Sequence, residues 1–210
     1  MEKKFELTDK FVFNTFGIKL FQIKCTKSFK YAKEGDLGGY VEKDENLDQE
    51  SNAWVYGDAW VYGNARVSGD ARVYGDARVY GDARVYGDAW VSGDARVYGD
   101  AWVYGNARVS GDARVYGNAR VSGDARVYGD ADIENDNNHC GFDCFGSCNR
   151  HTHAYLTKDN KVEITCGCFR GSIEEFEKKV EKTHSGTIYE KQYKAIINVI
   201  KIKFGLTDLI

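Results

Sequence analysis

Thirteen consecutive copies of one six-residue pattern, Ala-x-Val-x-Gly-[Asp/Asn], occupy residues 53–130, and a degenerate copy follows at residues 131–136. Ala and Val stand two residues apart, so in an extended segment both point to one side while the x residues point to the other. Because Gly accepts positive φ and Asp or Asn tolerates the left-handed region, the chain is predicted to turn after every copy. Short strands that bend at this interval around small and β-branched side chains predict a stacked coil rather than a sandwich.

The alternation also resembles the hexapeptide repeat of the left-handed β-helix superfamily, in which an aliphatic residue recurs every six positions with a small residue two before it. This resemblance implies a mainly β protein built on a left-handed parallel β-helix, with triangular coils of three copies each. The fourteen copies would then form between four and five coils, stacked about 4.8 Å apart. The resemblance also implies a homotrimer, which is the common assembly in that superfamily.

The sequence on either side of the repeats predicts two caps. Residues 1–52 are expected to form an N-terminal β cap, with a strand over residues 17–25 and irregular first rungs at Val41 and Leu47. The solenoid is expected over residues 53–136, and residues 137–210 form a C-terminal α+β cap.

Within this second cap, residues 161–166 alternate like a strand. Ser172 and Glu175 form a capping box that begins a helix with Phe176 and Val180 on its apolar face. A second helix is expected over residues 189–204.

Outward-facing residues fall into three columns when they are sorted by their place in an 18-residue coil, and one column is more uniform than the others. Tyrosine and arginine dominate it, and it predicts a binding surface made of Trp60, Tyr62, Arg78, Tyr80, Arg96, Tyr98, Arg114 and Tyr116. Arg and Tyr are enriched at protein interfaces, and Arg also grips phosphates. The alternative interpretation is structural, because repeats stack like on like and aromatic ladders stabilise neighbouring strands.

Charge limits the class of partner. The thirteen copies hold nine arginines and ten aspartates, and the whole chain has a formal net charge of −3. The chain therefore lacks the excess of positive charge that binding to nucleic acid or to an anionic membrane would need. A partner protein is expected, with a small nucleotide ligand held by the same arginines as the alternative.

One corner of the coil is predicted to carry only carboxylates, in the column Asp58, Asp76, Asp94, Asp112 and Asp130. Bonds to backbone amides or nearby arginines are the expected role of these side chains. Calcium is the alternative, although an oxygen-only calcium site needs six or more ligands.

Many members of the resembled superfamily are acyltransferases, in which a histidine acts as general base beside a loop that protrudes from the coils. Here the thirteen copies contain neither a histidine nor an insertion. The four histidines, His139, His151, His153 and His184, all follow the repeats. The sequence therefore predicts that the protein is not an enzyme, with an acyltransferase-like enzyme as the alternative.

Five of the six cysteines lie in the C-terminal part of the chain. A structural zinc site is one interpretation, with ligands drawn from Cys140, Cys144, Cys148, His151 and His153. The alternative is a set of reduced thiols without a cofactor, because the spacing departs from the two-residue gap of common zinc knuckles.

The segments Gly35-Asp-Leu-Gly-Gly-Tyr40 and Cys166-Gly-Cys-Phe-Arg-Gly-Ser-Ile-Glu-Glu-Phe176, together with the coils, resemble repeat-only solenoid proteins of bacteriophages and prophages. Such proteins are often labelled transferases from their fold alone. Because rigid repeat surfaces suit recognition, we expect a non-enzymatic binding or scaffold protein of this phage type, such as an inhibitor of a host defence, with a virion or assembly accessory as the alternative. Charges near the N-terminus interrupt any signal-peptide pattern, which predicts the cytoplasm, that of the host cell if a phage encodes the protein.

Overall fold

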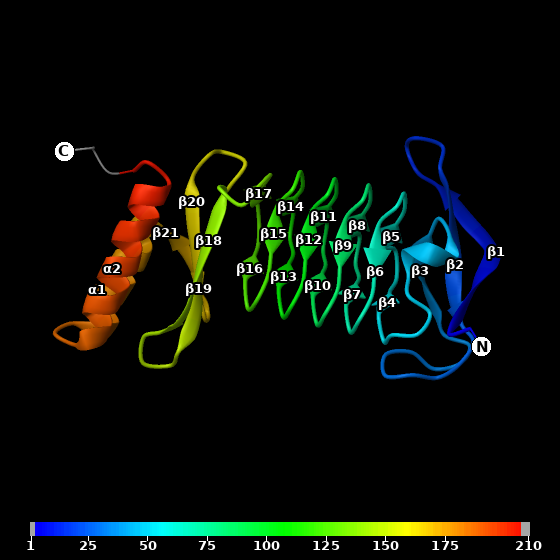
Figure 1. Cartoon of the computed structure of the whole chain (residues 1–210), viewed down its shortest axis with the longest axis horizontal. Helices are drawn as coiled ribbons and strands as arrows, with labels where there is room; N and C mark the ends of the chain where they lie inside the picture. The colour runs from blue at the N-terminus through cyan, green and yellow to red at the C-terminus, as the bar shows by residue number, and fades with distance from the viewer. Residues whose placement is uncertain (1–2, 207–210) are drawn as a thin grey trace.

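Each six-residue copy forms a two-residue strand followed by a turn at its Gly-Asp or Gly-Asn pair. The computed structural model describes residues 3–206 and places an N-terminal sheet, a solenoid and a C-terminal cap in that order along the long axis (Figure 1). The strands of the solenoid are β4 (Trp54–Val55), β5 (Trp60–Val61), β6 (Arg66–Val67), β7 (Arg72–Val73), β8 (Arg78–Val79), β9 (Arg84–Val85), β10 (Trp90–Val91), β11 (Arg96–Val97), β12 (Trp102–Val103), β13 (Arg108–Val109), β14 (Arg114–Val115), β15 (Arg120–Val121), β16 (Arg126–Val127) and β17 (Asp132–Ile133).

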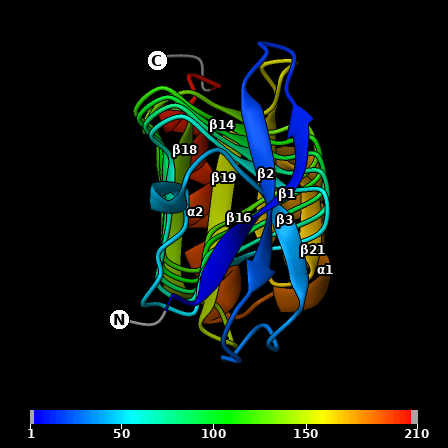
Figure 2. The same cartoon turned by 90° about the vertical axis from the view of Figure 1, so that its right-hand side faces the viewer.

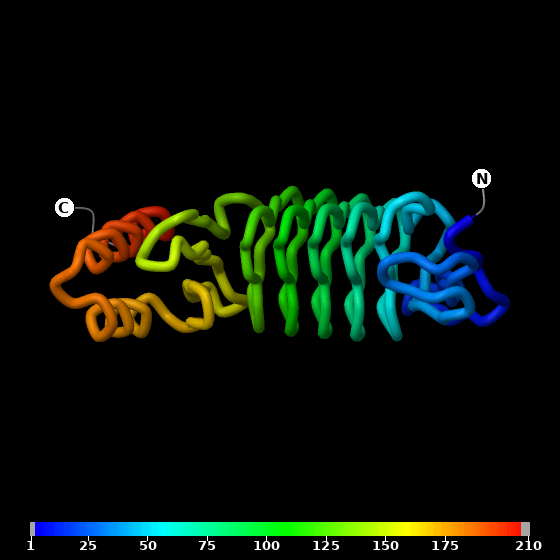
Figure 3. The backbone as a smooth tube through the Cα atoms, turned by 90° about the horizontal axis from the view of Figure 1, so that it is seen from below, coloured from blue at the N-terminus to red at the C-terminus, as the bar shows by residue number. Residues whose placement is uncertain are grey.

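Parallel pairing joins each strand to the strand 18 residues away, so Trp90 pairs with Arg72 on one side and Arg108 on the other. Three flat faces result, and Figure 3 shows the coils evenly stacked. The ladder face contains β5, β8, β11, β14 and β17; the groove face contains β4, β7, β10, β13 and β16; the third face contains β6, β9, β12 and β15. The predicted parallel solenoid and its 18-residue period are confirmed, with about five coils where between four and five were predicted, whereas the left hand stays a prediction.

Alanine and valine from every copy fill the interior, and the thirteen valines have no exposed surface. The turns need glycine for two reasons that Gly87 illustrates. Its φ is +69°, in the left-handed region, and a Cβ there would lie 3.0 Å from the backbone nitrogen of Gly105 in the next coil. Positive φ and close stacking together therefore fix glycine at this corner.

Three strands and a short 3-10 helix precede the solenoid: β1 (Phe5–Phe13), β2 (Lys19–Cys25), β3 (Leu37–Val41) and η1 (Asp44–Asn46). Val41 pairs in parallel with Val61, and Leu47 bridges Val67, which confirms both predicted irregular rungs. Strand β1 pairs with β2 and extends the sheet of the ladder face outward.

Lys4 closes the N-terminal end of the core. Its ammonium group is buried and donates to the carbonyl oxygens of Asp48, Ser51 and Ala53. Burial lowers the pKa of Lys4 to about 8. A charged side chain therefore satisfies backbone acceptors that no preceding coil covers.

The C-terminal cap is a four-stranded antiparallel sheet covered by two helices. Its elements are β18 (His139–Phe145), β19 (Arg150–Leu156), β20 (Val162–Cys166), β21 (Phe169–Ser172), α1 (Ile173–His184) and α2 (Ile188–Lys203). Ser172 and Glu175 form the predicted capping box, and the two helices begin within a residue of the predicted positions. The hairpin of β18 and β19, which the sequence analysis did not predict, holds most of the cysteine and histidine cluster.

The cap sheet lies between the last coil and the helices (Figure 1), and in the view along the long axis β18 and β19 lie within the outline of the coils (Figure 2). Tyr155 of β19 is fully buried and belongs to the solenoid core, while Ala154 on the opposite side of the strand packs toward the helices. One sheet thus closes the open end of the coil and provides a second core with α1 and α2. Neither of these two described helices is long and apolar enough to cross a membrane.

Candidate functional site

The ladder face places the predicted binding residues in register, as the sequence analysis expected. The rings of Tyr62, Tyr80, Tyr98 and Tyr116 stack with centroids 4.9, 4.9 and 5.0 Å apart and interplanar angles of 3°, 1° and 7°. The strands hold this spacing because Arg78, Arg96 and Arg114 pair directly across neighbouring coils.

Three arginines lie beside the tyrosines on this face. The guanidinium of Arg78 lies over Trp60 at 4.5 Å from the ring centroid. Among residues 3–206, neither it nor Arg96 or Arg114 forms an ion pair with a carboxylate. Burial raises the pKa of Tyr80, with the neighbouring arginines acting in the opposite direction. The ladder therefore presents neutral phenols beside a row of unpaired guanidinium groups.

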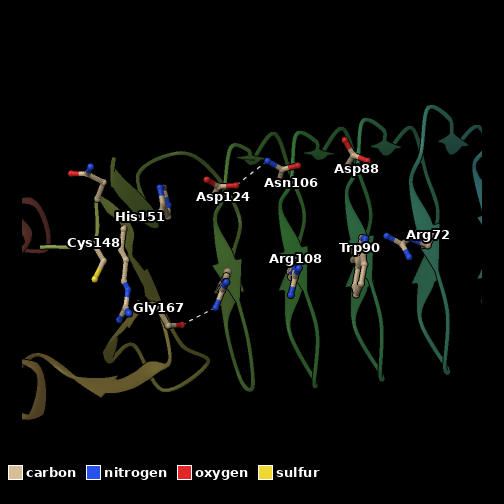
Figure 4. A pocket seen from close by; sticks show the side chains of 12 residues that line it. Arg72, Asp88, Trp90, Asn106, Arg108, Asp124, Cys148, His151 and Gly167 are labelled. Carbon is tan, nitrogen blue, oxygen red and sulfur yellow. Dashed lines mark hydrogen bonds between the residues drawn. The ribbon is translucent and has the colours of Figure 1, made fainter. Parts of the chain in front are cut away.

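The groove face carries a second feature, which we call the arginine groove. It is a depression of about 670 Å³ that runs along the face to the turn of the β18–β19 hairpin (Figure 4). Its lining includes four arginines and one tryptophan, namely Arg72, Arg108, Arg126, Arg150 and Trp90. The hairpin contributes residues 148–151 and closes one end of the groove.

Trp90 lies between two arginines from the coils before and after it. The guanidinium carbons of Arg72 and Arg108 are 3.9 and 4.6 Å from the Trp90 ring centroid. Stacking holds these guanidinium groups in place while leaving N–H groups to donate. The Nε of Arg72 is buried and has no hydrogen-bond partner.

Arg126 continues the row in the next coil. Its Nη1 donates to the carbonyl oxygen of Gly167 at 2.7 Å, which ties the last coil to the cap (Figure 4). Arg150 enters the same groove from the start of β19. The solenoid and the cap thus each supply part of the lining.

The corner beside these arginines carries two carboxylates and an amide. Asp88, Asn106 and Asp124 line this margin, and the Asn106 amide donates to Asp124 at 2.9 Å (Figure 4). The four arginines and two aspartates of the lining leave an excess of positive charge. Among the described residues, none of the four arginines forms an ion pair.

This groove was not predicted from the sequence. The order Arg72, Trp90, Arg108 at 18-residue spacing was a readable signal, since an arginine above and below a tryptophan predicts stacking. The third face repeats it, with Arg84 and Arg120 at 5.1 and 5.3 Å from the Trp102 centroid. What distinguishes the groove face is the cap beside it, whose position no repeat could predict.

Three of the four histidines meet between the cap sheet and the last coil. His139 Nδ1 and His153 Nε2 are 3.0 Å apart, and His151 Nδ1 lies 2.6 Å from a carboxylate oxygen of Asp143. The Nε2 atoms of His139 and His151 are buried without a hydrogen-bond partner. His184 lies elsewhere, at the end of α1, where its ring stacks on Tyr193 of α2.

The five residues predicted as zinc ligands are not brought together. Cys140 packs toward the helices, whereas His153 on the paired strand faces the solenoid. Cys144, in a bulged part of β18, and Cys148, in the turn, are exposed. Strand alternation separates them, because neighbouring residues of a strand point to opposite faces.

Residues 3–206 contain no group of three His, Cys, Asp or Glu side chains arranged to hold a metal ion. This covers the predicted zinc ligands and the predicted calcium column alike. The column itself forms as expected, since residues 58, 76, 94, 112 and 130 follow strands that stack in one sheet.

Part of the chain matches the model of the family described as YdcK Beta solenoid repeat. The match covers residues 59–75, 65–78, 77–93, 89–105, 101–117, 107–120, 113–129 and 119–133. No curated protein matches the chain. The matched segments all lie in the stacked coils, so the family match and the structure together establish the chain as a β-solenoid repeat protein.

Proposed function

We propose that this β-solenoid is a non-enzymatic binding protein that recognises a partner protein through its ladder face. The observation that carries the proposal is the in-register stack of Tyr62, Tyr80, Tyr98 and Tyr116 beside unpaired arginines. Tyrosine and arginine are the side chains that most often dominate binding energy at protein interfaces. A rigid face also loses little conformational entropy when it binds.

The charge on the face indicates the chemistry of the partner. Arg78, Arg96 and Arg114 repel one another at the spacing of adjacent coils, about 4.8 Å. An acidic strip on a partner would relieve this repulsion and form charge-assisted hydrogen bonds. The proposed partner therefore presents Asp and Glu side chains around an apolar centre that covers the tyrosines.

The third face offers a matched control, because Tyr86 and Tyr104 also stack there, with centroids 5.0 Å apart. A photo-crosslinking amino acid placed at Tyr98 or at Tyr86 would be tested in lysate of a bacterial host. We expect one defined protein to crosslink at position 98 and not at position 86. The Arg96→Glu change is expected to abolish that crosslink, and Arg84→Glu to preserve it.

Equal crosslinking from both faces, or a product that survives Arg96→Glu, would reject the ladder face as the binding surface. The stack would then serve only to stabilise neighbouring strands. Acyl transfer remains the enzymatic alternative. Release of free coenzyme A from acetyl-coenzyme A by the protein would favour it over a purely binding role.

A further inference from the structure

We propose that the arginine groove is a second, independent binding site, which takes a compact oligophosphate anion and recognises it through the phosphates alone. This site lies on the groove face and at its junction with the cap, so it does not depend on the ladder face. Three observations support it: unpaired charge, an unsatisfied buried donor and a closed end.

The first observation is the charge. Arg72, Arg108, Arg126 and Arg150 converge on one depression with only two aspartates, and none of these arginines forms an ion pair among the described residues. Guanidinium groups bind phosphate oxygens through paired, parallel N–H donors. Apart from Arg126 Nη1, which donates to Gly167, an anionic ligand would therefore use donors that the protein itself leaves free.

The second observation is the state of Arg72. Its guanidinium is held between Trp90 and Tyr31, at 3.9 and 4.6 Å from the two ring centroids, and its Nε is buried without a partner. A buried donor without an acceptor is costly, and native proteins seldom leave one. An anion in the groove would offset this cost through its attraction to the Arg72 guanidinium, which lines the groove.

The third observation is the shape. The hairpin turn at residues 148–151 blocks one end, and the volume of about 670 Å³ falls in the range of small-molecule sites. Carboxylates of Asp88 and Asp124 stand along the margin and repel a long polyanion. Both features favour a compact ligand over a nucleic acid strand.

Spacing favours linked phosphates over an acidic peptide. Arg108 and Arg126 occupy adjacent coils, about 4.8 Å apart. Side chains on one side of an extended peptide recur only every two residues, about 6.6 Å. Linked phosphoryl groups present oxygens more densely, so neighbouring arginines can bind one ligand together.

Trp90 limits how the ligand is recognised. Arg72 and Arg108 occupy its two stacking positions. A nucleobase therefore finds no free ring face on Trp90 to stack against. The role of Trp90 is to position the guanidinium groups. We expect the phosphates to supply the binding energy with or without an attached nucleoside.

Calorimetry with inorganic tripolyphosphate and with ATP, each without added metal, tests the proposal. We expect both to bind one site per chain, with Kd values within about threefold of each other. Arg108→Ala or Arg126→Ala should weaken binding about tenfold or more, the loss of one charge-assisted contact. Trp90→Phe should retain binding, because phenylalanine still separates and stacks with the arginines.

The third face again supplies the control. Arg120→Ala removes an arginine that stacks on Trp102 in the same way, yet lies outside the groove. We expect this variant to bind within twofold of the unmodified protein. The proposal is overturned if neither probe binds at millimolar concentration, if ATP binds while tripolyphosphate does not, or if Arg120→Ala weakens binding as much as Arg108→Ala.

Discussion

His139 Nδ1 lies 3.0 Å from His153 Nε2 at the boundary between the cap and the last coil. The His153 Nδ1 is 3.4 Å from the carbonyl oxygen of Arg126, which can only accept, so His153 carries its proton on Nδ1. Its Nε2 must then accept a hydrogen bond from His139 Nδ1. His153 is therefore neutral in the folded protein, and the contact between cap and solenoid depends on that state.

Acidification is expected to weaken this junction. Burial lowers the pKa of His153 to about 3, with His139 and His151 acting in the same direction. Burial also lowers the pKa of His139, against the opposing effect of Asp136, while Lys203 adds to the lowering. Unfolded histidine titrates near pH 6.5, so the unfolded chain binds more protons as the pH falls below that value. The contribution of these histidines to the free energy of unfolding is therefore present above pH 6.5 and is lost as the pH falls below that value.

For His153 alone the loss reaches about 2 kcal/mol at pH 5. Urea unfolding at pH 7.5 and pH 5 measures it, and the His153→Gln variant should show a smaller difference between the two pH values. His184→Gln is the control, because His184 lies outside this cluster. An unchanged pH dependence in His153→Gln would contradict the assignment.

The turn glycines allow a sharper test of coil stacking. Gly117 and Gly123 have nearly the same φ, +61° and +62°. A Cβ on Gly117 would lie 2.4 Å from the carbonyl oxygen of Glu134, whereas a Cβ on Gly123 meets nothing within 4 Å. Both alanine variants incur the cost of positive φ, about 1 kcal/mol.

Only Gly117→Ala also displaces backbone, so we expect it to lose about 2 kcal/mol or more in total. Thermal or urea unfolding of the two variants measures the difference. Equal destabilisation would mean that the coils can separate locally at no cost.

The solenoid was predictable because its signal is repeated. Each Ala-x-Val-x-Gly-Asp copy indicates which residues point inward, and the 18-residue period then places Tyr62, Tyr80, Tyr98 and Tyr116 in one column. One physical rule, applied thirteen times, leaves little freedom for the fold.

The caps carry no such repetition. Strand β1 was missed because its alternating Phe5 and Leu7 are separated from Phe11 and Phe13 by the polar residues 8–10. The hairpin of β18 and β19 was missed because its cysteines and histidines suggest metal ligands. In the structure their strand positions turn Cys140 and His153 to opposite faces.

The arginine groove could not be predicted for a different reason. Arg126 and Gly167 are separated in sequence by strands β17 to β20, and their hydrogen bond depends on how the cap docks on the last coil. Docking is set by Tyr155 entering the solenoid core and by the histidine contacts. Neither has a periodic signature.

Thiol reactivity tests the arrangement of the cap. Three cysteines are exposed and three are partly or fully buried; the exposed ones are Cys144, Cys148 and Cys168. Burial raises the pKa of Cys140 to about 11, which keeps its reactive thiolate scarce at neutral pH. We expect an aromatic disulfide reagent to modify three thiols rapidly and the others only after unfolding.

The same thiol titration, repeated with zinc added, tests whether the cap binds zinc. With no shared site for Cys144 and Cys148, one equivalent of zinc should leave the three rapid reactions unchanged. Protection of both cysteines together by zinc would show that the cap can assemble a metal site after all.

Deletions within the repeats can change the ladder face while the coil still folds. Removing residues 77–88 or residues 77–94 joins Asp76 to an alanine that begins another copy, so both chains keep an unbroken repeat. Both are expected to fold, with far-UV circular dichroism and cooperative melting as the measurements. The removed lengths are two copies and three copies, respectively.

The two deletion variants differ in which residues stack on each face, because three copies complete one coil and two copies do not. The longer deletion keeps Tyr62, Tyr98 and Tyr116 in one column, whereas the shorter one rotates the remaining coils by two faces and places Ser92 and Ser110 above Tyr62. We therefore expect the longer deletion to retain the crosslink from position 98 and the shorter one to lose it. If the shorter deletion bound as well as the longer, recognition would depend on the caps or on the coil backbone and not on the column of tyrosines and arginines.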